Sequence, residues 1–433
     1  MSQALLLAAT PEALLAPRLE QRILPGLDRM HGALAALGHP ERGLASVLVL
    51  GTNGKGSTAA LLASMLRAHG VRVGLYTSPH LVAVEERIRV DGEPIAPHSL
   101  LTRLHDLRRF PDLSYFETLT CAAILHFAEV KVGVAVMEAG LGGRWDASNA
   151  VDPVLALLTN VGTDHAKWLG EGRCAIAREK AAALRGREAI VGEWDDEVEG
   201  IIRAGADPAT PISLATQWAL VRGNDMPRTG HANAVSASPA PFAQEVAFAV
   251  GAARGTAVLP LAGPHQRANV QLALAAVAAL AKHGVLAQVS AAALAQGIHE
   301  VAWPGRLQPI EAGGRRLLLD GAHNREATAA LAHALDELSL SGQVHLLFSC
   351  FDDKPIADMA ALLRPRVTGV TIVELESPRA TPLACIAQHF PGCVERSGIG
   401  DALAALPSDR PTLVTGSLRL VGAVIAHLEG RDG

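Results

Sequence analysis

The hydrophobic positions of the chain alternate between short aliphatic runs and longer segments with helical spacing. The run 44–50 is short, continuous and aliphatic, which is typical of a strand buried on both faces of a sheet. A glycine-rich turn follows it, then a helical pattern over 56–69 and a second aliphatic run over 71–76. This order predicts a βαβ unit, in which a helix connects two strands.

The same alternation continues along the first two thirds of the chain. Residues 11–38 have helical spacing broken at 25–26, and residues 203–262, rich in Gly, Pro, Ser, Thr and Ala, predict loops with small antiparallel strands. Between and after these segments the pattern predicts helices over 119–129, 173–185 and 267–283, and strands over 132–137, 154–159 and 189–191.

A change of composition at 301–305, which reads Val-Ala-Trp-Pro-Gly, predicts a linker. Beyond it a second alternation predicts strands over 316–319, 344–348, 369–373 and 412–414, and helices over 325–338, 355–363 and 418–428. We therefore expect two α/β domains, one over 1–302 and a smaller one over 303–433.

The composition suits a folded protein with ample material for a buried core. The chain has 433 residues, of which 49% are hydrophobic and 19% charged, so wholesale disorder is excluded. Aromatic residues make up only 3%, so the cores are expected to consist mainly of Ala, Leu and Val. The net charge of −5 argues against a dedicated nucleic-acid binder but leaves room for a small anionic substrate.

The cysteines and the N-terminus indicate the compartment. The five cysteines are widely spaced and contain no CxxC pair, so neither a disulfide scaffold nor a thiolate zinc site is expected, and a reducing compartment fits better. The N-terminal apolar run has no basic segment before it, and no apolar stretch reaches about 18 residues, so we expect no signal peptide and no membrane span. A cytoplasmic protein is expected.

The strongest chemical signal lies between the first predicted strand and helix. It consists of Gly51, Thr52, Asn53, Gly54, Lys55, Gly56, Ser57 and Thr58. Glycines let successive backbone N–H groups turn toward an anion, Lys55 can reach terminal phosphates, and the Ser57 hydroxyl can bind Mg²⁺. The spacing departs from GxxxxGK[ST], because position 49 is Val and Gly56 separates the lysine from the serine. The segment predicts a phosphate-binding loop; the alternative is a turn that merely needs glycines.

Polar residues follow other predicted strands. Glu138 follows the run 132–137, where it is placed like the carboxylate that meets magnesium across the sheet from a phosphate loop. Asp320 follows the run 316–319, where a carboxylate can bind ribose hydroxyls. Arg306, next to the linker, can bring positive charge onto ATP phosphates as the domains close. Each of these residues alone is also compatible with a structural role.

The departure of the glycine-rich segment from the GxxxxGK[ST] spacing points to a particular class of phosphate loop. GTNGKGST resembles the ATP loop of the Mur ligase superfamily and, within it, of the folylpolyglutamate synthase/dihydrofolate synthase family. The resemblance runs from about residue 44 to about residue 420 and is weak around 18–25 and 203–262. It is carried further by YTSPH at 76–80, ERIRV at 86–90, MEAGLGGRWDASN at 137–149, TDH at 163–165, PGR at 304–306 and DGAHN at 320–324.

The resemblance implies a fold with two parts. The N-terminal domain, 1–302, is expected to be a P-loop ATPase-like domain of the Mur ligase type that binds ATP and the pterin. The C-terminal domain, 303–433, is expected to be a Rossmann-like α/β domain with contacts to glutamate and ATP.

The resemblance also implies a metal site. Two magnesium ions are expected, with Ser78, Glu138 and His165 as ligands beside the hydroxyl of Ser57. Because magnesium prefers oxygen ligands, the role of His165 depends on the resemblance rather than on coordination chemistry. Lys180 occupies the place of a lysine that carries a carbamate in this family. Only a neutral amine reacts with CO₂, so the pKa of Lys180 would have to be lowered locally.

Roles in ATP binding, catalysis and substrate binding are implied in the same way. The resemblance assigns ATP contacts to the loop residues, Asn269, Arg306 and Asp320, and catalytic roles to Lys55, Lys180 and His323, the last as the group that positions glutamate. It assigns the pterin pocket to Ser114, Tyr115, Phe116 and Glu117 and to Trp145, Asp146 and Ala147, and a place near the amino acid to Ser417. Residues 18–25 match the pterin-contacting loop of the family poorly.

The activity implied is that of an ATP-dependent ligase. It adds L-glutamate to 7,8-dihydropteroate, and to tetrahydrofolate, through an acyl phosphate, with ATP, Mg²⁺, glutamate and the pterin as small-molecule partners. Members of this family are commonly monomeric, so a monomer is expected. Two alternatives stay open from the sequence: a folylpolyglutamate synthase without dihydropteroate activity, and a non-catalytic P-loop nucleotide switch.

Overall fold

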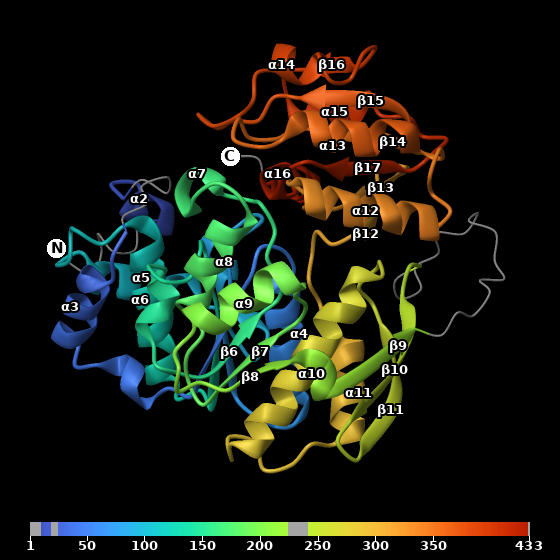
Figure 1. Ribbon diagram of the computed structural model, residues 1–433. Helices are drawn as coiled ribbons and strands as arrows, with labels where there is room; N and C mark the ends of the chain where they lie inside the picture. Colours follow the sequence, from blue (N-terminus) through green and yellow to red (C-terminus); the bar gives the residue numbers. More distant parts are fainter. Residues whose placement is uncertain (1–9, 19–24, 224–240, 432–433) are drawn as a thin grey trace. The chain divides into compact units, whose positions relative to one another are not determined.

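The computed structural model describes residues 10–18, 25–223 and 241–431 (Figure 1). The chain divides into two compact units, whose main boundary lies between Glu300 and Val301, at the change of composition. Two shorter stretches of the described chain, 241–246 and 258–267, also belong to the second unit, although the sequence analysis places them in the domain 1–302. The poorly matching segment 18–25 and the stretch 203–262 lie partly outside the described residues, at 19–24 and 224–240.

The first unit is built on an eight-stranded sheet with the order β4-β3-β2-β5-β1-β6-β7-β8. The six strands from β2 to β8 in this order pair in parallel, whereas β3 pairs antiparallel with β2 and with β4. The strands are β1 (Ser46–Leu50), β2 (Val73–Tyr76), β3 (Ile88–Val90), β4 (Glu93–Pro94), β5 (Val134–Glu138), β6 (Pro153–Leu158), β7 (Glu188–Val191) and β8 (Ile212–Leu214).

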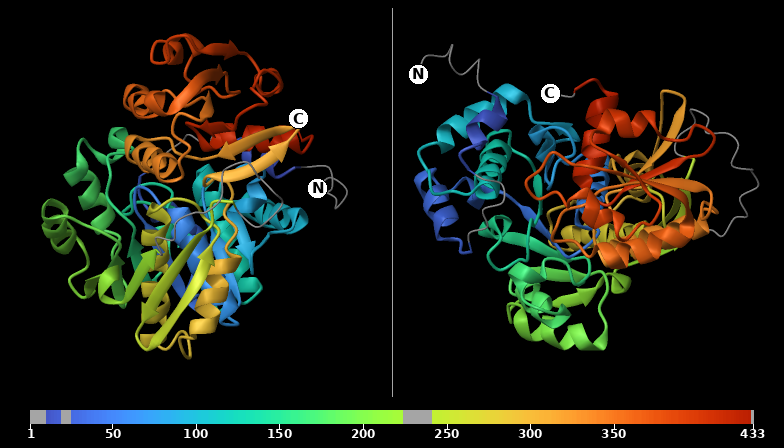
Figure 2. Two further views of the ribbon diagram at one scale, coloured as in Figure 1. Left: turned by 90° about the vertical axis from the view of Figure 1, so that its right-hand side faces the viewer. Right: turned by 90° about the horizontal axis from the view of Figure 1, so that it is seen from above.

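Helices cover both faces of this sheet, which explains why its central strands are continuous aliphatic runs. On one face Leu48, Leu50 and Met137 pack in a core with α6 (Tyr115–Glu129). On the other, α4 (Lys55–Ala68) packs on β1, β2 and β5. The other helices of the unit are α2 (Pro11–Leu15), α3 (Asp28–Ala36), α5 (Pro97–Leu107), α7 (Ala166–Leu169), α8 (Arg173–Ala181), α9 (Asp196–Gly205), α11 (Ala291–Glu300) and, from Ala268 onward, α10 (His265–Lys282). Helices α8 and α9, drawn in green in Figure 2, pack on each other.

The stretch 203–262 differs in part from the loops and small antiparallel strands that its composition predicts. It contains the end of α9 and the strand β8, which extends the parallel sheet by pairing with β7. A separate three-stranded sheet has the order β11-β10-β9 and consists of β9 (Ala219–Gly223), β10 (Gln244–Val250) and β11 (Ala253–Leu259). Side chains along β10 alternate between buried and more exposed, as expected for a strand with one covered face.

The second unit contains a six-stranded sheet with the order β12-β13-β17-β14-β15-β16. The five strands β13 to β16 in this order pair in parallel, and β12 pairs antiparallel with β13. Its elements are β12 (Gln308–Ala312), β13 (Arg315–Leu319), α12 (Arg325–Glu337), β14 (Val344–Phe348), α13 (Ile356–Leu363), β15 (Val367–Val373), α14 (Leu383–Ala387), β16 (Val394–Arg396), α15 (Ile399–Ala404), β17 (Thr412–Thr415) and α16 (Leu418–Leu428).

Both units therefore have the predicted class, mixed α/β with mainly parallel sheets. In each unit the loops after the carboxyl ends of the parallel strands gather at one edge of the sheet, where such folds bind ligands. In the part of the chain that the structure describes, no helix combines the length and the apolar character needed to span a bilayer.

Candidate active site

The glycine-rich loop joins the end of β1 to the start of α4, as predicted. Two of its glycines have positive φ angles, 143° at Gly51 and 81° at Gly54. A Cβ atom at Gly51 would overlap the Oγ1 of Thr159, and one at Gly54 would lie 2.5 Å from the Oδ1 of Asn269. Both positions therefore require glycine, for conformation and for space. The loop leads into the start of α4, and the backbone N–H groups at a helix N-terminus can bind an anion.

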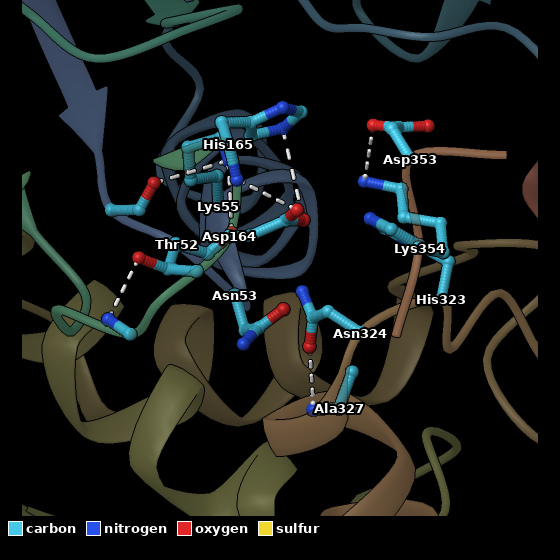
Figure 3. A network of polar contacts seen from close by, with 12 residues as sticks. Thr52, Asn53, Lys55, Asp164, His165, His323, Asn324, Ala327, Asp353 and Lys354 are labelled. Carbon is cyan, nitrogen blue, oxygen red and sulfur yellow. Dashed lines mark hydrogen bonds and ion pairs between the residues drawn. The ribbon is translucent and has the colours of Figure 1, made fainter. Parts of the chain in front are cut away.

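Residues that follow β6 hold this loop in place. The Thr159 hydroxyl donates a 2.6 Å hydrogen bond to the carbonyl of Asn53, and the Asn160 side chain contacts the backbone of Asn53 through both its oxygen and its nitrogen. The hydroxyl of Thr52 accepts a 2.8 Å bond from the N–H of Gly162 (Figure 3). Because β6 is the neighbour of β1, the residues that follow β6 reach the loop. Their contacts with Thr52 and Asn53 fix the shape of the loop.

Two lysines converge on one carbonyl of the loop. Lys55 Nζ donates to the carbonyl oxygens of Gly51, at 3.2 Å, and Thr52, at 3.1 Å (Figure 3). Lys180 Nζ, from α8, donates to the same oxygen of Gly51 at 2.7 Å. Lys180 is only 3% exposed. Burial and then the charge of Lys55 lower its pKa to about 7, against the opposing effect of Asp146 and Asp164.

Ser57 and Asn269 lie at the start of α4. The Ser57 side chain is buried and forms no hydrogen bond with another described residue, so its hydroxyl is available to a ligand at the helix N-terminus. Asn269, from α10, accepts a 3.3 Å hydrogen bond from the Thr58 hydroxyl and lies against Gly54. Asn269 therefore lies at the phosphate loop, where the sequence analysis expects it.

The expected metal ligands follow neighbouring strands of the sheet. Ser78 follows β2, Glu138 ends β5 and His165 lies beyond β6, and these strands flank β1 in the order β2-β5-β1-β6. The buried carboxylate of Glu138 accepts a 3.0 Å hydrogen bond from the N–H of Ser78, which brings these two residues together. His165 has a φ of 64°, and its Nε2 lies 3.7 Å from a carboxylate oxygen of Asp164 (Figure 3).

The donor set at this edge fits a magnesium ion. Hydroxyls of Ser57 and Ser78 and the carboxylate of Glu138 are oxygen donors, which magnesium prefers. Within the described ranges no group of three or more His, Cys, Asp or Glu side chains forms a metal cage. That is compatible with magnesium, which usually keeps several waters and is bound through one or two carboxylates and substrate phosphates.

Asp146 is a buried carboxylate with internal partners. Its two oxygens accept hydrogen bonds from the N–H of Leu141, at 2.7 Å, and from the N–H and hydroxyl of Ser148, at 2.9 and 2.5 Å. Burial raises its pKa, and these hydrogen bonds oppose the rise. Asp146 thus fixes the loop after β5 and caps the short 3₁₀ helix Ala147–Ala150. Its neighbour Trp145, by contrast, is 51% exposed.

The segment 114–117 has a divided role. Ser114 and Glu117 form a capping box at the start of α6, and Glu117 also pairs with Arg29 at 2.9 Å. Their side chains are therefore engaged in holding the helix N-terminus. Tyr115 and Phe116 are half-buried; the Arg87 guanidinium lies 5.2 Å from the Tyr115 ring centre, and Phe116 packs against Gly140. These two rings are the members of the segment that can offer a face to a ligand.

In the second unit, Asp320 follows β13 and is also internally bonded. It accepts 2.9 Å hydrogen bonds from the N–H groups of Leu307 and Ala322. Burial raises the pKa of Asp320, and the positive charge of Arg306 acts most strongly against that rise. Arg306 donates a 2.8 Å hydrogen bond to the carbonyl of Gly305. The structure therefore brings Arg306 and Asp320 together within one unit.

The neighbouring strand β17 adds Ser417 to the same edge of this unit. Ser417 is buried and caps α16, accepting a 3.0 Å hydrogen bond from the N–H of Arg419. The N–H of Gly416 donates to the carbonyl of Ala322, which ties the two loops together. His323 Nδ1 lies 2.7 Å from the carbonyl of Gly321, so Nδ1 carries the proton that this oxygen accepts.

Lys354 is a residue of this edge that the sequence analysis missed. It follows β14, its side chain is 5% exposed, and it lies 3.5 Å from Asp353, which also pairs with Arg379 (Figure 3). Buried lysines are rare unless they are paired, and Asp353 supplies the partner of this one. The available signal was the charged segment 352–354 directly after an aliphatic strand. Charged loop residues are common, however, and the sequence does not reveal which of them are buried.

Comparison with known proteins defines the class. Residues 49–277 match the Mur ligase middle domain, and residues 305–419 match the Mur ligase glutamate ligase domain. Together with the two α/β units and the glycine loop between β1 and α4, these matches place the chain in the Mur ligase superfamily.

Full-length relatives narrow the class to one family. The chain is 32% identical over 376 residues to the dihydrofolate synthase/folylpolyglutamate synthase of Bacillus subtilis, with 84% of each chain covered. It is 33% identical over 417 residues to the Escherichia coli protein of the same name, with 94% of this chain and 92% of that protein covered. The chain belongs to the dihydrofolate synthase/folylpolyglutamate synthase family, which confirms the resemblance seen in its motifs.

Solved structures share the fold. E. coli FolC in complex with DHPP and ADP has a TM-score of 0.84, 29% identity and complete coverage of both chains. The Yersinia pestis bifunctional folylpolyglutamate synthase/dihydrofolate synthase, complexed with AMPPNP and a manganese ion, has a TM-score of 0.79 and 29% identity, and covers 99% of this chain and 100% of its own. The expected fold class is thus confirmed, and these relatives bind adenine nucleotides, one of them with a divalent metal.

Proposed function

We propose that the chain is an ATP-dependent ligase that joins L-glutamate to 7,8-dihydropteroate and to tetrahydrofolate. The family supports this proposal, since both the B. subtilis and the E. coli relatives are named for the two activities. A Lacticaseibacillus casei relative, 32% identical over 414 residues, is named folylpolyglutamate synthase alone, so the dihydropteroate activity needs its own test. The non-catalytic nucleotide switch leaves the match of residues 305–419 to a glutamate ligase domain without a role.

The observation that carries the proposal is the construction of the loop between β1 and α4. Glycines at 51 and 54, the helix N-terminus and the ammonium group of Lys55 support a site for a polyanion. In the proposed reaction, residues 51–57 and Asn269 hold the phosphates of ATP, and Lys55 neutralises the charge that develops on the γ-phosphoryl group.

The first chemical step forms an acyl phosphate. An oxygen of the acceptor carboxylate attacks the γ-phosphorus, the bond to the bridging oxygen breaks, and ADP leaves. Ser57, Ser78, Glu138 and His165 would hold magnesium, which when bound neutralises and orients the phosphates. The residues of the chain contribute mainly by positioning and electrostatics, because the activated carbonyl needs no protein nucleophile.

The second step forms the amide. The neutral α-amine of glutamate attacks the acyl carbon, the tetrahedral intermediate expels phosphate, and the amine loses a proton. We assign the acceptor to the domain 1–302, with Tyr115, Phe116 and the segment Trp145–Ala147 at its pocket and Ser114 and Glu117 holding α6. We assign Arg306 and Asp320, of the domain 303–433, to ATP, and His323 and Ser417 to the incoming glutamate.

Lys180 has a specific place in this scheme. A pKa of about 7 leaves a large neutral fraction at neutral pH, which an ordinary lysine lacks. The neutral amine can attack CO₂, forming a carbamate and releasing a proton. The carbamate would replace a buried positive charge by a negative one beside the donors for magnesium, and we propose that this modification organises the metal site.

The test measures ADP release by the purified protein with ATP, Mg²⁺ and glutamate. It is run in parallel with 7,8-dihydropteroate, with tetrahydrofolate and without acceptor. Glutamate-dependent ADP release with both acceptors supports the full proposal. Release with tetrahydrofolate alone identifies a folylpolyglutamate synthase, and no release with either acceptor refutes the ligase assignment.

A further inference from the structure

Two tryptophans of the first unit have unusually exposed indole rings. Trp145 is 51% exposed and Trp168 is 50% exposed. Among the described residues they are the two aromatic members of the small set of large hydrophobic side chains left on the surface. Aromatic residues make up only 3% of this chain, and leaving two indoles in water forgoes hydrophobic stabilisation. Exposed apolar side chains that lie near one another can mark the site of a ligand or a partner.

The two indoles come from neighbouring segments beside the phosphate site. Trp145 lies in the loop after β5, and Trp168 lies on α7. The loop and the helix touch, because a Cβ at Gly142 would lie 2.8 Å from a methyl carbon of Leu169. The loop also lies against α8 at Lys180, because a Cβ at Gly143 would lie 3.3 Å from the Cα of Lys180 and the N–H of Arg144 donates a 3.1 Å hydrogen bond to the carbonyl of Glu179. Trp145 and Trp168 therefore border the site of the proposed reaction.

A positively charged side chain lies near each of the two indole rings. The Arg144 guanidinium carbon lies 5.9 Å from the centre of the Trp145 ring, and Lys167 Nζ lies 5.9 Å from that of Trp168. Neither cation forms an ion pair with another residue in the described ranges. Each of the two pairs, 144–145 and 167–168, thus combines an exposed aromatic ring with a positive charge. This combination complements a flat ligand with a carboxylate.

We propose that Trp168 and Lys167 belong to the acceptor site, with Trp168 stacking on the aryl ring next to the reacting carboxylate and Lys167 binding a second carboxylate that does not react. The proposal rests on the function proposed above. Dihydropteroate has a single carboxylate, which is consumed in the reaction, so it offers nothing to Lys167. An acceptor that already ends in glutamate has two, of which one reacts and the other meets Lys167. Trp168 therefore serves both acceptors, and Lys167 favours the glutamylated one.

The test compares steady-state kinetics of Trp168→Ala, Trp168→Phe and Lys167→Ala with both acceptors. We expect Trp168→Ala to raise the KM of both acceptors by about tenfold, and Trp168→Phe to restore most of the loss. Lys167→Ala should raise the KM of tetrahydrofolate by about fivefold and leave that of dihydropteroate unchanged. The KM of ATP and the thermal unfolding midpoint should stay constant, because both side chains are exposed.

Two control variants test whether the loss of any exposed apolar or charged side chain has the same effect. Leu220→Ala removes another exposed apolar side chain, 52% exposed on β9, and Arg203→Ala removes a cation that lies 4.8 Å from the ring of Trp194. Neither should change an acceptor KM. The proposal is overturned if Trp168→Ala leaves the KM of both acceptors unchanged, or if Lys167→Ala changes the KM of both acceptors equally. Either result leaves the ligase assignment intact, because that assignment depends on the turnover of the wild-type protein. Concentration-dependent self-association that Trp168→Ala abolishes would assign the surface to an interface between copies and also overturn it.

Discussion

At the scale of single residues, the central feature is a backbone carbonyl oxygen that accepts hydrogen bonds from two lysine side chains. Lys55 and Lys180 both donate to the oxygen of Gly51. Burying a charged ammonium group costs free energy, and burial therefore lowers the pKa of Lys180 to about 7. For this reason we assign different roles to the two lysines: Lys55 is proposed to supply positive charge to the phosphates, and Lys180 a reactive amine.

Removing the charge of Lys55 should disable the reaction without unfolding the protein. Lys55→Ala is expected to lower kcat by about 100-fold or more, because it removes a group that stabilises the transferring phosphoryl group. The unfolding free energy should change by about 1 kcal/mol or less, since the side chain makes only two hydrogen bonds to carbonyls. Coupled ADP release and thermal melting check both, with Lys131→Ala as the control for an exposed lysine. Turnover near the wild-type value would remove Lys55 from the mechanism.

The neutral fraction of Lys180 should be visible as carbon dioxide uptake. With ¹³C-bicarbonate, a carbamate resonance is expected in the wild type and absent in Lys180→Ala. The signal should grow as the pH rises through about 7, because the lowered pKa makes the amine neutral there, whereas ordinary lysines stay protonated until about pH 10. Buffers freed of CO₂ should lower turnover. A resonance of equal intensity in Lys180→Ala would contradict the assignment.

Single residues also show what a sequence can reveal. The spacing of Gly51, Gly54, Lys55 and Ser57 predicts a phosphate loop because it depends only on residues close in the chain. The 114–117 segment predicts a substrate contact, yet Ser114 and Glu117 are engaged in capping α6 and in pairing with Arg29. Arg29 is distant in sequence from this segment, so the pattern gives no sign of that pair.

At the scale of elements, the site depends on the order of strands in the sheet. Sequence patterns predict most central strands and helices, because strands covered on both faces are continuous aliphatic runs. They do not reveal that β5 and β6 flank β1, which is what brings Glu138 and Asn160 beside one loop. Short edge elements such as β4 and β16 lack a recognisable pattern, since each has only two or three residues.

The tight junction between β1 and α4 should not tolerate a side chain. Gly54→Ala places a Cβ 2.5 Å from Asn269 and forces alanine to a φ of 81°. We expect a loss of about 1–2 kcal/mol in unfolding free energy and a rise of about tenfold in the Kd of ATP. Isothermal titration and chemical denaturation check these values. Gly200→Ala, on α9 with open space around it, is the control and should leave nucleotide affinity unchanged. Unchanged ATP affinity in Gly54→Ala would place the phosphates elsewhere.

At the scale of the whole molecule, each unit has its own parallel sheet and its own cluster of polar residues at the carboxyl edge. The first contains the residues to which we assign the nucleotide phosphates and the metal, and the second contains Arg306, Asp320 and Ser417. One part of the chain matches the middle domain of Mur ligases, and the other matches their glutamate ligase domain. These matches agree with different roles for the two parts in binding and catalysis.

If both units act on one ATP, a change in the second must affect nucleotide use. Arg306→Ala is expected to lower kcat/KM for ATP by at least about tenfold, because a charge-assisted contact to phosphate is lost. The pKa of Asp320 should rise further, since Arg306 is the main influence that lowers it. Arg316→Ala, on β13 of the same unit, is the control and should have normal turnover. Wild-type kinetics in Arg306→Ala would restrict ATP binding to the first unit.

The most direct measurement follows an oxygen atom through the reaction. The acceptor is prepared with ¹⁸O in its carboxylate, and the phosphate released with ATP, Mg²⁺ and glutamate is analysed by mass spectrometry. Attack of the carboxylate on the γ-phosphorus predicts one ¹⁸O atom in each phosphate that accompanies amide formation. Phosphate that contains oxygen only from ATP and water would contradict an acyl phosphate, and with it the proposed ligase mechanism.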